Sequence, residues 1–155
     1  MSLKFFQFVV VLPALFLAAC SGWPAGVTPP DHGVGEMVSD PFKTVVNEQG
    51  GVSVAITPLN LSAAATTLDF EVALDTHSVD LSMDMATLAT LAADTGRQAT
   101  ATRWDAPRGG HHVVGVLSFP AIIDGVSLLD GASRLTITLR NVDVPERTFT
   151  WDVSS

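Results

Sequence analysis

The chain is poor in several features by which proteins are commonly classified. It contains one cysteine in 155 residues, so no disulfide can form within the chain and packing alone must stabilise a folded domain. Only eight residues are basic, whereas sixteen are acidic. This balance disfavours nucleic acid and an anionic membrane surface as partners, because both would repel an acidic protein.

Sequence motifs of common enzyme classes are also missing. The chain has no Gly-x-Ser-x-Gly elbow, no phosphate-binding Gly-Lys-Ser/Thr loop and no His-Glu-x-x-His helix. Asp75, His77 and Ser78 are the residue types of a hydrolytic triad, but such close neighbours in sequence rarely adopt triad geometry. We therefore expect that the protein is not an enzyme.

The longest apolar run lies at the start of the chain. It extends from Phe5 to Ala19 after a single Lys4. It is shorter than the roughly 20 apolar residues that a membrane-spanning helix needs. A basic start, a short apolar stretch and small residues at its end are typical of a secretory signal peptide, here residues 1–19. Its removal would leave a charge balance of 7 − 16 = −9.

The end of this run resembles the lipobox of bacterial lipoproteins. The motif is Leu17-Ala18-Ala19-Cys20, and Cys20 is the only cysteine in the chain. The resemblance implies that Cys20 is lipid-modified and becomes the new N-terminus. In Gram-negative lipoproteins a serine after the cysteine, here Ser21, favours transfer to the outer membrane. We therefore expect a protein that is lipid-anchored in the cell envelope, on the periplasmic face of the outer membrane.

The remaining chain divides into a linker and one domain. Residues 20–49 are rich in Gly and Pro, include the pair Pro29-Pro30 and show no sustained periodicity, which is typical of a flexible tether. From residue 50 the pattern changes to the alternation of apolar and polar residues that indicates half-buried strands. We predict a linker over residues 20–49 and a domain over residues 50–155.

Seven short segments of this domain carry a strand pattern. They are residues 52–56, 68–74, 87–93, 98–104, 113–119, 135–140 and 149–153. The segment 87–93 is the weakest and is also compatible with a short helix. Regularly spaced short strands without an amphipathic helix predict an all-β fold, an immunoglobulin-like antiparallel β-sandwich of about seven strands. A partly closed barrel is the main alternative.

Several stretches of the domain resemble exported bacterial domains, many of them lipoproteins, with a predicted immunoglobulin-like fold. The stretches are residues 74–81, Trp104, residues 109–112 and residues 115–119, within a region of about 50–152. The resemblance implies the fold and the compartment, and it implies no particular activity.

Alternating strand directions place three predicted loops, residues 75–86, 105–111 and 141–145, at one end of the sandwich. Imidazole and thioether ligands together suit copper, so these loops predict a possible copper site. Its candidate ligands are His77, Met83, Met85, His111 and His112. In the structural alternative the methionines cover the end of the sandwich and the histidines bond loop carbonyls.

Oxygen ligands nearby raise calcium as a lesser option. Asp75, Asp80 and Asp84 are suitable donors, but their spacing does not match an EF-hand loop. The leading functional hypothesis is a non-enzymatic binding module that meets another envelope protein through loops or strand edges. A periplasmic copper-binding protein and a purely structural envelope component are the alternatives.

Overall fold

The computed structural model describes residues 40–153, and this part of the chain is almost entirely β-structure. It holds eleven strands and one short 3-10 helix, η1 (Met85–Thr87). The strands are β1 (Val45–Asn47), β2 (Val52–Asn60), β3 (Thr67–Thr76), β4 (Ala89–Ala93), β5 (Gln98–Thr100), β6 (Arg103–Asp105), β7 (His112–Pro120), β8 (Ile122–Ile123), β9 (Val126–Ser127), β10 (Arg134–Val142) and β11 (Val144–Asp152). Within residues 40–153 no helix is long and apolar enough to cross a bilayer.

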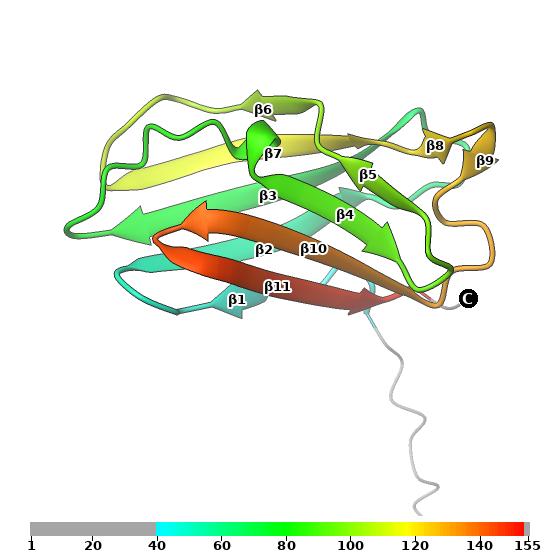
Figure 1. The fold of residues 1–155 in the computed structure, drawn as a ribbon, viewed down its shortest axis with the longest axis horizontal. Helices are drawn as coiled ribbons and strands as arrows, with labels where there is room; N and C mark the ends of the chain where they lie inside the picture. Colours follow the sequence, from blue (N-terminus) through cyan, green and yellow to red (C-terminus); the bar gives the residue numbers. More distant parts are fainter. Residues whose placement is uncertain (1–39, 154–155) are drawn as a thin grey trace, which may run out of the picture. The chain divides into compact units, whose positions relative to one another are not determined.

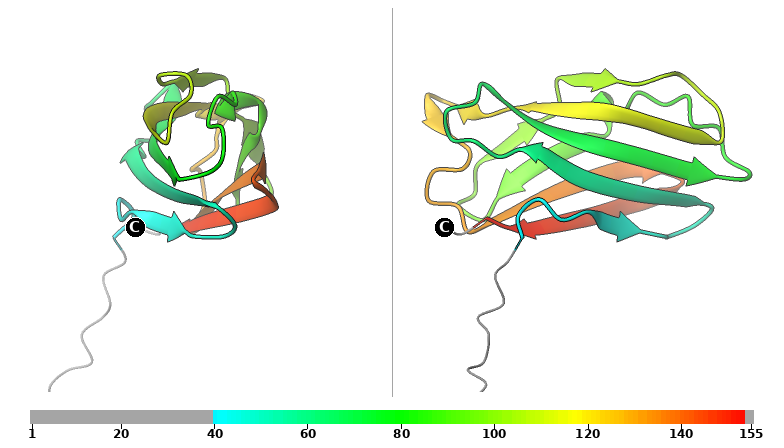
Figure 2. Two further views of the ribbon diagram at one scale, coloured as in Figure 1. Left: turned by 90° about the vertical axis from the view of Figure 1, so that its left-hand side faces the viewer. Right: turned by 180° about the vertical axis from the view of Figure 1, so that it is seen from behind.

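The strands form two main antiparallel sheets that face each other (Figures 1 and 2). One sheet has the strand order β1-β2-β3-β7-β6, and the other has the order β11-β10-β4-β5. A separate two-stranded hairpin, β8-β9, follows β7. The order β2-β3-β7-β6 opposite β11-β10-β4 is the A-B-E-D and G-F-C arrangement of immunoglobulin domains. The predicted sandwich is therefore confirmed, with eleven strands in the described residues instead of about seven.

The core lies between the two sheets and follows the period-two pattern of the sequence. Strand β3 alternates buried and more exposed residues along its length, and β11 does the same from Arg147 to Trp151. Phe70 contacts Phe119 edge to face, with ring centroids 5.7 Å apart, and also lies 5.5 Å from the ring of Trp151. The contact between Phe70 and Trp151 joins the two sheets.

The predicted strand 98–104 is in fact two strands in different sheets. Strand β5 pairs with β4, whereas β6 pairs with β7. The change occurs between two consecutive residues: the amide of Ala101 donates to Ala89 in one sheet, and the amide of Thr102 donates to Ser118 in the other. The segment therefore crosses from one layer of the sandwich to the other.

The domain begins earlier than the predicted boundary at residue 50. Strand β1 lies within the predicted linker and pairs with β2 from Val45 to Asn47. Just before it, the carbonyl of Lys43 accepts a 2.8 Å hydrogen bond from the indole of the buried Trp151. The folded domain thus includes residues 43–47, of which Val45–Asn47 belong to the sheet. The predicted signal peptide (1–19), Cys20 and the linker up to residue 39 lie outside the described residues.

The predicted loop 141–145 is also more compact than expected. Strand β10 continues to Val142 and β11 begins at Val144, so that Asp143 alone separates them. Asn141 and Asp143 have φ angles of +59° and +58°, a left-handed conformation that Asn and Asp tolerate better than most residues. The side chain of Asp143 thereby reaches a neighbouring strand.

Candidate functional site

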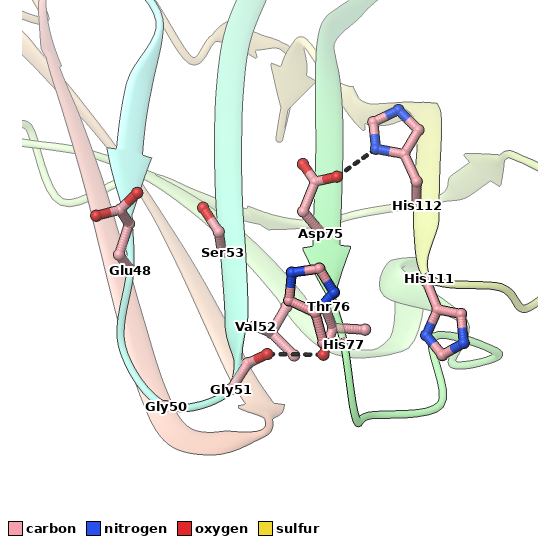
Figure 3. A pocket seen from close by; sticks show the side chains of 10 residues that line it. All are labelled: Glu48, Gly50, Gly51, Val52, Ser53, Asp75, Thr76, His77, His111 and His112. Carbon is pink, nitrogen blue, oxygen red and sulfur yellow. Dashed lines mark hydrogen bonds and ion pairs between the residues drawn. The ribbon is translucent and has the colours of Figure 1, made fainter.

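One end of the sandwich carries a recess of about 510 Å³ between the start of β2, the end of β3 and the start of β7 (Figure 3). Its lining residues are Glu48, Gly50, Gly51, Val52, Ser53, Asp75, Thr76, His77, His111 and His112. Antiparallel pairing brings these elements together, because Val52 is opposite Thr76 and Asp75 is opposite His112. We call this end of the sandwich the recess end.

An imidazole and a carboxylate form a hydrogen-bonded pair at the recess. Nδ1 of His112 bonds Oδ1 of Asp75 on the adjacent strand, and both side chains are more than half exposed. Figure 3 shows the ring of His112 directed at Asp75, whereas His111, its neighbour in the chain, is turned away from that carboxylate. With Nδ1 engaged by Asp75, Nε2 is the ring nitrogen that an approaching partner meets.

The arrangement around this pair does not assemble a hydrolytic triad. Ser53 and His112 both flank Asp75 in register, so the carboxylate stands between the hydroxyl and the imidazole. Two strand spacings of about 4.8 Å separate Ser53 from His112, well beyond the roughly 3 Å at which a base accepts a proton. Ser53, Asp75 and His112 are therefore not arranged as a hydrolytic triad.

Thr76 organises the loop beneath the recess. Its side chain is buried, and Oγ1 donates a 2.7 Å hydrogen bond to the carbonyl of Gly51. The same oxygen accepts hydrogen bonds of 3.2 Å from the amides of Ser78 and Val79. One hydroxyl thus joins the start of β2 to the loop that carries His77.

A buried arginine holds the opposite side of the recess end. Arg147 is 1% exposed, and its Nε donates to the carbonyl of Val142 at 3.1 Å. Its Nη1 donates to the carbonyl and Oδ1 of Asn47 at 3.1 and 3.0 Å, and its Nη2 donates to the carbonyl of Gln49 at 2.5 Å. The guanidinium therefore ties the β1–β2 loop to the β10–β11 hairpin.

Asp143 reinforces the same connection. Its Oδ2 accepts a 2.5 Å hydrogen bond from the amide of Gly51. Burial lowers the pKa of the Arg147 guanidinium from its ordinary value, and the negative charge of Asp143 opposes this shift. The Asp143 carboxylate thus favours the protonated form of the buried Arg147 guanidinium. It also fixes the backbone of Gly51, which lines the recess.

The structure brings together only part of the predicted copper site. His77, His111 and His112 line the recess, which confirms that their loops share one end. Met85 is fully buried in the hydrophobic core, and Met83 lines a separate cavity beside Trp104 and other residues. The predicted set of imidazole and thioether ligands is therefore not assembled, because η1 turns the Met85 side chain into the core.

The acidic residues of the predicted calcium alternative have local structural roles. Asp75 pairs with His112, Asp80 accepts hydrogen bonds from Ser82, and Asp84 caps η1. Within residues 40–153 no group of three or more His, Cys, Asp and Glu side chains is arranged to hold a metal ion.

Sequence reasoning missed the residues that support the recess from the β1–β2 and β10–β11 sides. The burial of Arg147 could have been predicted. Alternate residues of a strand face the same side, and Arg147 precedes the inward-facing Phe149 and Trp151 at this spacing. Glu48 was assigned to the linker, since the three residues of β1 are too few to show a period.

Comparison with known proteins gives no matching family model, no matching curated protein and no matching solved structure. The resemblances to lipoproteins and to exported immunoglobulin-like domains therefore remain predictions from the sequence.

Proposed function

We propose that this protein is a non-enzymatic binding module of the cell envelope, anchored by a lipid on Cys20, which offers its recess end to a partner protein. The observation that carries the proposal is the position of the chain's entry into the domain. Pro41 and Phe42 line a cavity with Leu61 and Val153, which follow the far ends of β2 and β11. The recess lies at the near ends of the same two strands.

The placement of the chain's entry and the recess at opposite ends of the sandwich suits a tethered receptor or adaptor. Strands of nine residues such as β2 span about 30 Å at 3.3 Å per residue, so the recess is about that far from the entry end. A lipid attached before residue 40 would hold the entry end nearest to the membrane. The recess end would then be the part most accessible to another protein.

The edges of the sheets favour contact through the recess over the addition of a partner strand. Strands β5 and β6 lie at the edges of the two sheets and have only three residues each. Short edge strands offer few hydrogen bonds to an added strand. The opposite edge strand β11 packs near β1, and Trp151 donates to Lys43 there. Loop contact is therefore the mode that we propose.

The anchor is tested on the full-length chain produced in a Gram-negative host. Intact-mass measurement should give a mature chain that begins at residue 20 and carries a diacylglyceryl group and an N-acyl group. The Cys20→Ser variant should lose this mass and leave the membrane fraction. An unmodified wild-type cysteine would contradict the anchor.

The binding role is tested by affinity purification of the full-length chain after cross-linking in the envelope of cells that naturally produce it. We expect one protein to be enriched with the wild type and to be lost with Asp75→Ala combined with His112→Ala. The matched control, Thr138→Ala with Thr148→Ala, changes the outer face of the other sheet, and the partner protein should still be enriched with it. Equal recovery with both double variants would contradict recognition at the recess.

A further inference from the structure

Apolar side chains gather at the end of the sandwich where the chain enters the domain. Six large hydrophobic residues of the described chain are exposed, and four of them belong to this end: Phe42 (47% exposed), Leu59 (50%), Ile122 (52%) and Val126 (41%). We call these four residues the entry-end patch. The first two lie before β1 and near the end of β2, and the other two lie on the β8–β9 hairpin.

The backbone holds this hairpin at the entry end. The amide of Ala121 donates to the carbonyl of Thr66 just before β3, and the turn of the hairpin is formed by Asp124 and Gly125 with φ angles of +52° and +81°. Two central residues with positive φ are the requirement of a type I′ hairpin turn. The hairpin therefore has a defined conformation, in which Ile122 (opposite Ser127) and Val126 (opposite Ile123) are exposed on its two faces.

An apolar cavity of about 520 Å³ adjoins the patch. Its lining residues are Pro41, Phe42, Leu61, Ala63, Leu129, Gly131, Ala132 and Val153. None of these residues is charged, and most have aliphatic or aromatic side chains. Exposed apolar surface beside such a cavity is the kind of surface that marks an interaction site.

The length of the preceding chain indicates what this end meets. Nineteen residues lie between Cys20 and Asp40, and the flexible linker that the sequence predicts there would have a mean end-to-end distance of about 25 Å. If Cys20 carries the proposed lipid, Asp40 lies on average about 25 Å from the membrane surface. The entry-end patch is then the part of the domain held closest to that surface.

Charges near the patch define the kind of lipid surface that would be compatible. Asp40 and Asp124 lie at this end together with the exposed Lys43, which follows Phe42, and the positive charge of Arg97 is paired with Asp130 at 3.5 Å. The carboxylates thus outnumber the cations that could meet an anionic headgroup. Anionic lipids would repel these carboxylates, whereas zwitterionic headgroups present ammonium groups to them. The charge pattern therefore favours a zwitterionic surface.

We infer that the entry-end patch docks onto a zwitterionic phospholipid surface and orients the domain with its recess end away from the membrane. The inference rests on the proposed lipid anchor and adds a second, non-covalent contact to it. The several acyl chains of the proposed anchor would already hold the protein at the membrane, so contact of the patch with the headgroup and acyl boundary would mainly fix the orientation of the domain.

The test uses the mature lipid-modified chain in vesicles of phosphatidylethanolamine and phosphatidylcholine. Because the native cysteine is blocked by lipid, Ser127→Cys introduces one labelling site beside Ile122 for an environment-sensitive fluorophore. Ser78→Cys gives the matched site at the recess end. We expect blue-shifted emission, quenched by brominated acyl chains, at position 127 and water-like emission at position 78.

The variants Ile122→Ser and Val126→Ser together should abolish the shift at position 127 while the chain still floats with the vesicles. A wild-type chain that floats but shows water-like emission at position 127 would overturn the docking alone. Emission at position 127 that is blue-shifted but not quenched by brominated lipid, and whose shift grows with the number of chains per vesicle, would indicate contact with a second copy of the chain. This result would overturn the docking onto lipid. A chain that does not float with vesicles would overturn the anchor and the docking together.

Discussion

Arg147 is the residue that most constrains the recess end, because it brings a positive charge into the interior. Within the described residues no carboxylate lies within ion-pair distance of it, and its partners are mainly carbonyl groups from Asn47, Gln49 and Val142. Such an arrangement is favourable only while all the hydrogen bonds are made, since burial of a charge is costly. The arginine therefore acts as a specific connection between two loops.

Replacement of this residue should destabilise the fold strongly. We expect Arg147→Met to lower the free energy of unfolding by about 3 kcal/mol, because several buried carbonyls lose their donor. Arg140→Met is the control, since Arg140 is 69% exposed, pairs only with Glu146 and should change stability by less than about 1 kcal/mol. Urea unfolding followed by circular dichroism measures both, and equal losses would contradict the role of Arg147.

Gly115 allows β7 to pack closely against the segment that follows β6. A Cβ atom at this position would lie 2.7 Å from the carbonyl oxygen of Asp105 and 2.8 Å from the ring of Trp104. We expect Gly115→Ala to cost about 1–3 kcal/mol through overpacking. At Gly51 a Cβ would meet no atom closer than 3.4 Å, so Gly51→Ala should have little effect. Thermal unfolding of the two variants distinguishes these results.

The hydroxyl of Thr76 should control the order of the loop that carries His77. In Thr76→Val the shape is retained, but the amides of Ser78 and Val79 lose their acceptor. We expect faster hydrogen exchange at these two amides and a loss of about 1–2 kcal/mol of stability. Thr148→Val, on an exposed surface, is the control, and unchanged exchange in Thr76→Val would show that the loop is held by other contacts.

At the scale of elements, strands with one buried face were the most predictable part of the fold. Long stretches of β2, β3, β10 and β11 show period two, because each packs against the core on one side. The predicted strand 52–56 was too short, since β2 continues past Pro58 through an irregular pairing to Asn60. A local pattern therefore locates strands better than it locates their ends.

The division between β5 and β6 could not be read from the sequence. Both halves of the segment alternate, and the change of sheet depends on hydrogen bonds from Ala101 and Thr102 to residues far away in the chain. The clustering of histidines was predictable from strand direction, because antiparallel strands return loops to the same end. The burial of Met85 was not, since it depends on how η1 packs against the core.

Strand β1 should be essential to the domain although it has only three residues. A chain that begins at residue 50 lacks the carbonyls of Asn47 and Gln49 that accept from Arg147, and the carbonyl of Lys43 that accepts from Trp151. We expect this truncated chain to be several kcal/mol less stable than a chain that begins at residue 40. Urea midpoints of the two chains measure the difference, and equal midpoints would contradict a structural role for β1.

At the scale of the whole domain, the two ends of the sandwich differ in chemistry. The recess end presents imidazoles, carboxylates and backbone groups, whereas the entry end presents aliphatic and aromatic side chains. Loops of a rigid sandwich are a common place for recognition, since the strands hold them in position. This difference supports one end as a membrane contact and the other as a binding surface.

The most direct test of this account is site-specific photo-crosslinking of the full-length chain in the envelope of cells that naturally produce it. A photoreactive residue in place of His77 at the recess end is compared with one in place of Thr148 on the outer face of the second sheet. The account predicts an adduct with one defined protein from position 77, none from position 148, and loss of the adduct in the Cys20→Ser variant. Equal adducts from both positions, or an adduct at position 77 that persists without Cys20, would contradict a lipid-anchored module that binds through its recess.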